Sequence, residues 1–389
     1  MKKKLLASLL MSILVLSLCA CGGTSSSSSG DVIKVGIFEP LTGNYAAGGQ
    51  VEKNGIDLAN QLYPTVTVAG KTIQIQLVSA DNKSDQGEAA TAASKLIDQD
   101  KVTAILGSWG SGLCMAAGDI VKNAKIPAIA ASATNPLVTQ GNEYYFRVCF
   151  IDPFQGTVMA NYAYNELGAK NVAILQTISS DYSVGLANNF KTQFEKLGGK
   201  IVDTQSYNTG DTDFSAQLQN LKAKNPDAIF APGDYTESAM AIKQARDLGI
   251  QTPFLGGDTY EIQAFIDVGG PAVEGVVFSS FFDPDNPLND EAKKFVSEYK
   301  KKYNDVPPAN AANAYDAYLV LLDAIKRANS TDPTAIRDAL AKTSGFVGAT
   351  GTTTLDADRN AVKDAILKVV EKDANGQLVF KFKEIGKAQ

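Results

Sequence analysis

The sequence predicts an α/β fold with two lobes, each built around a parallel sheet. Short apolar segments alternate with helical segments along most of the chain, a pattern typical of parallel strands joined by helices. The alternation starts afresh at residue 171, and 389 residues are too many for one ordinary hydrophobic core. Since right-handed crossovers bring the carboxyl ends of parallel strands to one edge of a sheet, we expect ligand-binding residues along that edge.

The first lobe begins with strands and helices in strict alternation. The strand at 71–81 alternates apolar and polar side chains, whereas the segment at 127–133 begins wholly apolar, like a buried parallel strand. The expected strands are residues 32–41, 71–81, 102–109 and 127–133, and the expected helices are residues 49–63, 87–100 and 113–125.

The second lobe repeats the same alternation. Apolar runs of strand length again precede longer helical segments. The expected strands are residues 171–177, 200–207, 226–233, 252–258 and 274–282, and the expected helices are residues 184–198, 213–225 and 237–249.

Two Asp-Pro segments indicate where the chain crosses between lobes, "RVCFIDPFQG" at 147–156 and "VVFSSFFDPDNPL" at 276–288. Helices expected at 289–303 and 311–329 follow without a new set of strands, so we expect them to cover the first lobe. Residues 365–385 contain the Asn-Gly turn of a hairpin. We therefore predict lobe 1 from residues 31–151 and 279–362, and lobe 2 from residues 152–278 and 363–389.

The N-terminal residues predict an export signal. Three lysines precede a short apolar stretch at 5–18, as in secretory signal peptides. The junction "LCACGG" resembles a lipoprotein signal-peptidase site, so we expect residues 1–20 to be removed and Cys21 to carry a lipid with palmitate. Cys19 fits less well because the bulky Leu18 precedes it. An ordinary secretory signal with incidental cysteines is the alternative.

A Gly/Ser-rich segment at 21–30 follows this junction and predicts a flexible tether. A lipid, a tether and a folded body together predict an extracytoplasmic protein anchored to the cell membrane by Cys21.

Composition excludes several classes of function. A net charge of −6 argues against nucleic acid as a partner, and the absence of histidine removes the commonest general base and metal ligand. Cys114 and Cys149 lack metal-ligand spacing, so they form either a disulfide or, as we favour, two buried thiols. We expect no metal and no cofactor.

Six fragments in a fixed order, together with the pattern that joins them, resemble a known family. They are "PLTGNYAAGGQVEKNGIDLA", "ILGSWGSG", "ASATNPLVTQ", "DPFQG", "SSDYSVGLA", "FLGGD" and the strand–helix pattern that joins them over nearly all of residues 31–389. The chain resembles the branched-chain amino acid group of type I periplasmic binding proteins, the substrate-binding lipoproteins of ABC importers. The resemblance implies two Rossmann-like lobes joined by a three-segment hinge, which close on a free amino acid and deliver it to an ABC permease.

The resemblance also implies where an α-amino acid is held. Such a ligand is a zwitterion, and neutral donors at a helix N-terminus suit its carboxylate. The family's carboxylate contacts correspond to Ser111 and Thr134, and a backbone carbonyl corresponding to Ser132 faces the ammonium. Ala133 lies between these positions, and small residues let the backbone approach the ligand. The residues alone fit equally a loop that caps the next helix.

Two acidic residues are candidates for the ligand ammonium. Asp258 follows the strand that ends in Gly256 and Gly257, at a position where the family often has Glu. The shorter side chain implies a different ligand depth or a bridging water, and the alternative is a helix N-cap. Asp152 fits either a second acidic group in the cleft or a hinge residue that caps "PFQG".

Aromatic residues are expected to form the pocket walls. Tyr182 should close on the ligand from the second lobe, where its ring supplies apolar area and its hydroxyl a hydrogen bond. Trp109, the only tryptophan, is the candidate wall for the ligand side chain, and Tyr45 is a further candidate. Either Asp234 or Tyr235 is expected to enter the cleft. Packing before a helix is the alternative for Tyr182, and packing in the core is the alternative for Trp109.

Two other classes of function remain as alternatives. An enzyme on the same fold is disfavoured because the chain has no histidine, Gly-x-Ser-x-Gly elbow or Walker motif. A sensor for another amino acid, or for an amide or urea-type ligand, stays open. We expect a monomer that binds Leu, Ile or Val.

Overall fold

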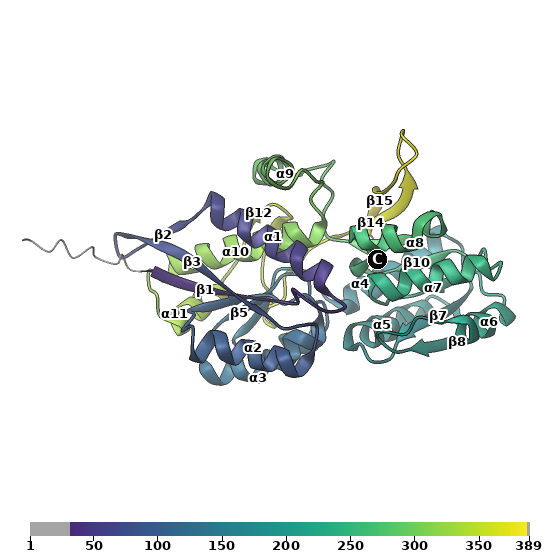
Figure 1. The fold of residues 1–389 in the computed structure, drawn as a ribbon, viewed down its shortest axis with the longest axis horizontal. Coiled ribbons are helices and arrows are strands. Elements are labelled where there is room, and N and C mark those ends of the chain that lie inside the picture. Colours follow the sequence, from purple (N-terminus) through teal and green to yellow (C-terminus); the bar gives the residue numbers. More distant parts are fainter. Residues whose placement is uncertain (1–31, 387–389) are drawn as a thin grey trace, which may run out of the picture. The chain divides into compact units, whose positions relative to one another are not determined.

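The structure is a computed structural model that describes residues 32–386. These residues form a six-stranded sheet, a seven-stranded sheet and a small two-stranded sheet, with helices packed on both large sheets (Figure 1). The predicted signal peptide, the tether and the lipid-attachment residue Cys21 lie outside the described residues. Among residues 32–386, we find no helix that combines the length and the apolar character needed to span a membrane.

The first large sheet has the strand order β2-β3-β1-β4-β5-β6 and is parallel except for β2, which pairs antiparallel with β3. Its strands are β1 (Val32–Glu39), β2 (Thr65–Val68), β3 (Lys71–Asp81), β4 (Ala104–Leu106), β5 (Ala128–Ala130) and β6 (Tyr145–Arg147). Helix α1 (Ala46–Leu62) lies on one face, and helices α2 (Gln86–Asp98) and α3 (Ser111–Ala124) lie on the other (Figure 1).

The second large sheet has the order β15-β14-β11-β10-β9-β7-β8. Its central strands are parallel, and β14 and β15 add an antiparallel edge. The strands are β7 (Asn171–Thr177), β8 (Lys200–Tyr207), β9 (Ala228–Phe230), β10 (Phe254–Gly256), β11 (Val277–Ser280), β14 (Ala365–Lys372) and β15 (Leu378–Gly386).

Helices sandwich this second sheet as they do the first. Apolar side chains of α6, α7 and α8 form one buried cluster, and those of α4 and α5 belong to another. The elements are α4 (Asp152–Asn161), α5 (Asp181–Lys196), α6 (Ser215–Ala223), α7 (Tyr235–Asp247) and α8 (Gln263–Gly269), with the short helices η1 (Pro136–Val138), η2 (Tyr162–Glu166), η3 (Asp258–Tyr260) and η4 (Gly270–Val273).

The chain returns from β11 to the first sheet through three helices. These are α9 (Asp290–Tyr303), α10 (Ala309–Ala328) and α11 (Pro333–Leu340), followed by the hairpin of β12 (Phe346–Gly348) and β13 (Gly351–Thr353). Helix α10 packs on α1, and a Cβ at Gly55 would lie 2.1 Å from Ala311 O. Glycine at position 55 therefore permits the close approach of these two helices. The lobe boundaries at 151, 278 and 362 stay a prediction.

Several expected strands are shorter than their apolar segments. Strand β4 ends at Leu106 and β5 ends at Ala130, although we expected strands to 109 and 133. The residues beyond these ends are loops, but they are buried. Burial of the loops explains why their small and apolar residues look like a continued strand.

Some elements carried too weak a signal to be expected, among them β2, β6, α4, α8 and α11. Helix α4 begins at Asp152 with Pro153 in its first turn. A proline there gives up no intrahelical hydrogen bond, so the Asp-Pro pair begins a helix instead of ending a lobe with a loop.

Candidate functional site

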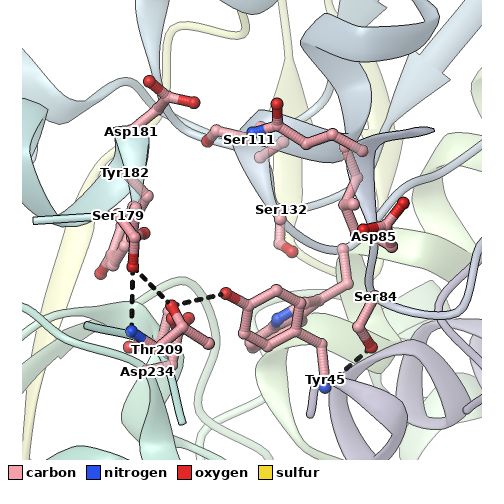
Figure 2. A pocket seen from close by; sticks show the side chains of 18 of the residues that line it. Tyr45, Ser84, Asp85, Ser111, Ser132, Ser179, Asp181, Tyr182, Thr209 and Asp234 are labelled. Carbon is pink, nitrogen blue, oxygen red and sulfur yellow. Dashed lines mark hydrogen bonds between the residues drawn. The ribbon is translucent and has the colours of Figure 1, made fainter. Parts of the chain in front are cut away.

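A cavity of about 450 Å³ lies between the carboxyl ends of the strands of the two large sheets. Figure 2 shows side chains from both sides converging on it, with Ser132 and Ser84 from the first sheet and Tyr182 and Thr209 from the second. Its volume falls within the range of small-molecule sites in proteins.

The structure brings most of the predicted site residues together. The predicted residues that line the cavity are Trp109, Ser111, Ser132, Ala133, Tyr182, Asp234, Asp258 and Tyr45. Of the pair Asp234 and Tyr235, Asp234 lines the cavity, whereas the Tyr235 hydroxyl donates to Asn44 O at 3.0 Å.

Two predicted residues, Thr134 and Asp152, do not line the cavity. Both are fully buried, and the Asp152 N–H donates to Thr134 O at 3.0 Å. Asp152 is the first residue of α4, which starts where the chain crosses to the second sheet. Burial, together with the charge of Asp258, raises the pKa of Asp152 to about 8.

One side of the cavity is built from the start of α3. Gly110 precedes this helix with φ at 91°, and no side chain caps the helix. The first N–H groups of a helix have no intrahelical acceptor, so they are free to face an anion. Gly110, Ser111 and Gly112 all line the cavity, which places this helix N-terminus against it.

Ser111 and Ser132 are each tied to a neighbouring element. The Ser111 hydroxyl oxygen accepts a hydrogen bond from Asn135 N at 3.1 Å, which fixes the loop after β5 against α3. The Ser132 hydroxyl donates to Glu52 Oε1 of helix α1. That bond uses the Ser132 hydroxyl proton and holds the loop after β5 against α1.

The opposite side of the cavity carries the carboxylate of Asp258. Its Oδ1 accepts hydrogen bonds from Gln155 Nε2 at 2.6 Å and from the Tyr182 hydroxyl at 2.9 Å. Burial raises the pKa of Asp258 to about 6, and the two donors act against this rise. No cation of the described residues forms an ion pair with Asp258, so its charge is available to a cationic ligand group.

Gly257 makes this arrangement possible. A Cβ at Gly257 would lie 2.1 Å from the Tyr182 hydroxyl oxygen, and any larger residue would displace Tyr182 from Asp258. The space beside Gly257 is thus taken by an aromatic side chain. Gly256 acts likewise, because its Cβ would lie 2.1 Å from the ring of Tyr260.

Trp109 forms an aromatic wall at the first-sheet side. Its ring meets that of Tyr235 edge to face, with the ring centroids 6.2 Å apart. A Cβ at Gly48 would lie 2.5 Å from the indole, so this glycine leaves the space that Trp109 occupies. The backbone N–H of Trp109 donates to Glu39 Oε2 at 2.7 Å.

Polar contacts connect the two sides around the cavity. Asn135 Nδ2 donates to Asp181 O at 2.9 Å, and the hydroxyl oxygens of Tyr45 and Thr209 lie 3.5 Å apart (Figure 2). Thr209 follows β8 and was missed from the sequence, as were Ser179 and Asn208, which also line the cavity. Their position directly after a strand of the second sheet was the signal that could have found them.

The described residues contain two free thiols and no cluster suited to a metal ion. Cys114 and Cys149 are both free and buried. No group of three or more Asp, Glu or Cys side chains in residues 32–386 is arranged to hold a metal ion. The groups that line the cavity are therefore hydroxyls, amides, aromatic rings and carboxyls, which suit the binding of a small polar molecule.

Comparisons with known proteins agree with this architecture. Residues 32–377 match the periplasmic binding protein family. Leu/Ile/Val-binding protein homolog 2 of Brucella abortus is 31% identical over 355 residues, which are 90% of this chain and 92% of that protein. The crystal structure of the leucine-binding protein LivK from Thermotoga maritima is 42% identical with a TM-score of 0.84, and the match covers 90% of this chain and 97% of that one.

A further solved structure is LivJ, a branched-chain amino acid transporter substrate-binding protein from Streptococcus pneumoniae in complex with isoleucine. It is 35% identical with a TM-score of 0.83, and the match covers 91% of this chain and 100% of that one. The chain therefore belongs to the periplasmic binding protein family, in the Leu/Ile/Val-binding group with the type I fold.

Proposed function

We propose that this protein captures free Leu, Ile or Val outside the cytoplasm and delivers it to an ABC importer. The observation that carries the proposal is the cavity with an uncapped helix N-terminus on one side and the Asp258 carboxylate on the other. A zwitterion presents opposite charges to these two groups. Its carboxylate would meet the start of α3 with Ser111, and its ammonium would meet Asp258 and the carbonyl of Ser132.

The ligand side chain would lie against Trp109, with Tyr45 nearby. Aromatic rings favour an aliphatic side chain because they bury apolar area without a charge to desolvate. LivJ of Streptococcus pneumoniae was solved with isoleucine, and LivK of Thermotoga maritima is a leucine-binding protein, which supports the branched-chain choice. Thr134 and Asp152 would act on the ligand indirectly, by supporting the loop after β5 from below.

Capture would proceed by closure of the two lobes. Contacts to the ligand come from both sheets, so only the closed arrangement makes all of them, and ligand shifts the equilibrium toward it. We propose that the protein binds without chemical conversion, acts as a monomer and is anchored through a lipid on Cys21. A Cys21→Ala variant should not incorporate radiolabelled palmitate and should leave the membrane fraction. If the variant still incorporates the label and stays with the membrane, Cys21 is not the lipid anchor.

A thermal-shift and calorimetric survey of the common amino acids tests the proposed ligand. A ligand that binds only the folded state stabilises it by about 4 kcal/mol at a thousandfold excess over Kd. Leu, Ile and Val should raise the melting temperature most. A shift with an amide, a urea-type compound or another amino acid, and none with these three, would replace the proposed ligand with that compound. D-leucine is the matched control, since it has the same groups in the wrong arrangement.

A further inference from the structure

Two glutamates are buried directly behind the first-sheet side of the cavity. Glu39 ends β1 and Glu52 lies in α1, and both side chains are fully buried. Neither forms an ion pair with a Lys or Arg of the described residues. Two buried carboxylates without a countercharge would destabilise the fold, so we expect protonation to reduce the charge of the pair.

The hydrogen-bond partners of the four carboxyl oxygens indicate where such a proton would lie. Glu39 Oε2 accepts from the backbone N–H of Trp109 at 2.7 Å, and Glu52 Oε1 accepts from the Ser132 hydroxyl. The other oxygen of each, Glu39 Oε1 and Glu52 Oε2, is buried with no donor among the described residues. Burial and the charge of Glu52 raise the pKa of Glu39 well above its usual range. The Glu39 and Glu52 carboxyls lie within hydrogen-bond reach of each other, so one proton held between the two free oxygens would satisfy both at once.

We propose that Glu39 and Glu52 share one proton, and that this acid–carboxylate pair is a positioning element that holds Trp109 and Ser132 in place for the ligand. The proposal rests on the proposed function, because it assigns a role at the same site. Glu39 fixes the backbone of the loop after β4, and Glu52 fixes the loop after β5. The shared proton connects the two loops through β1 and α1. It would therefore fix the distance between Trp109, which contacts the ligand side chain, and the Ser132 carbonyl, which faces the ligand ammonium.

Other titratable groups surround this pair. Cys114 of α3 and Tyr145 of β6 face Glu39. Burial raises the pKa of Cys114 to about 11 and the pKa of Tyr145 well above its usual value. Cys149, whose pKa burial also raises, and Asp258 across the cavity face Glu52. The thiols and the phenol stay neutral near neutral pH, so Asp258 is the one of these four that titrates together with the pair.

The proton itself is tested by unfolding at different pH. If the folded protein holds this proton and the unfolded protein releases it, the folded state loses stability as the pH rises. The loss runs from the pKa of the unfolded state to the pKa of the folded state. Glu39→Gln replaces the shared proton with an amide N–H that can donate to Glu52 Oε2. From about pH 5 to about pH 7, the unfolding equilibrium constant of the wild type should rise about tenfold per pH unit relative to that of Glu39→Gln.

Asp258 and the other buried acids are present in both proteins, so the difference between the two pH profiles reports on Glu39 and on its coupling to them. The exposed Glu195→Gln on α5 is the matched control and should unfold with the wild-type pH dependence. An identical pH dependence of the wild type and Glu39→Gln would refute the shared proton. This measurement needs no ligand, so it remains decisive even if Leu, Ile and Val do not bind.

The positioning role is tested by comparing Glu39→Gln with Glu39→Ala. Glu39→Gln keeps an acceptor for Trp109 N and a donor for Glu52, so it should bind Leu within about threefold of the wild type. Glu39→Ala removes both and should weaken binding by tenfold or more. Trp109 is the only tryptophan of the chain, so its fluorescence reports on this loop without ligand. The emission should change in Glu39→Ala and stay at the wild-type position in Glu39→Gln.

Three outcomes would overturn the positioning role. In the first, Glu39→Ala binds Leu like the wild type. In the second, Glu39→Gln loses binding as severely as Glu39→Ala. In the third, the Trp109 emission of Glu39→Ala is unchanged. If Glu39→Ala does not fold, Glu52→Gln replaces it, since its amide can donate to Glu39 Oε1 and accept from Ser132. Glu52→Gln should then bind like the wild type, and a tenfold loss would refute the role.

Discussion

The two sides of the cavity are suited to opposite charges of the ligand for different physical reasons. On the first-sheet side, the start of α3 offers N–H groups with no charged side chain, and Ser111 adds a hydroxyl. On the second-sheet side, Asp258 offers a full charge that Tyr182 and Gln155 hold by neutral hydrogen bonds. The first arrangement spreads its effect over backbone groups, and the second concentrates it in one side chain. Mutation should therefore damage the second side far more than the first.

Loss of the Asp258 charge is expected to have the largest effect. Asp258→Asn keeps Oδ1 as an acceptor for Gln155 and Tyr182 but removes the counter-charge of the ligand ammonium. Leu affinity should fall about a hundredfold, or about 3 kcal/mol, in calorimetry. The exposed Asp267→Asn in α8 is the matched control and should bind normally. Unchanged affinity in Asp258→Asn would mean that another group binds the ammonium.

The pH dependence of binding sharpens the same contrast. The pKa of Asp258 is raised to about 6, so its charge is present above that pH and is lost below it. Leu affinity should fall toward acid by up to about tenfold per pH unit below about pH 6. Tyr182→Phe removes a donor that opposes the rise in the Asp258 pKa, so the fall should begin at higher pH. An acid fall that persists in Asp258→Asn would assign it to a different carboxyl.

The wall between the two sides should control which side chain is preferred. Trp109→Ala opens space beside Gly48 and Tyr235, and it should change the ratio of Leu to Val affinity by roughly tenfold. Competition calorimetry with the three branched-chain amino acids measures that ratio, and circular dichroism confirms the fold. An equal loss of all three would contradict a specificity role, because it would mean that Trp109 supports the charged ends instead.

The contrast between the two sides also explains what the sequence could predict. Asp258 and Trp109 follow strand ends beside glycines, and Tyr182 lies in the first turn of α5, so short motifs reveal these positions. The Glu39 and Glu52 pair gave no such signal, because each glutamate lies in an ordinary strand or helix and only the fold brings them together. The fold class and most strands followed from periodicity, whereas the helix at Asp152 was missed because Asp-Pro also ends helices.

The smallest effect is expected at Ser111, where the backbone bears most of the interaction. Ser111→Ala removes one hydroxyl but leaves the N–H groups at the start of α3, so Leu affinity should fall by about threefold. The same change leaves Asn135 N without its acceptor, so the melting temperature should fall more clearly than the affinity. The exposed Ser297→Ala on α9 should change neither quantity. If Ser111→Ala weakened binding as much as Asp258→Asn, a single side chain would hold each end of the ligand, and the two sides of the cavity would not differ as described.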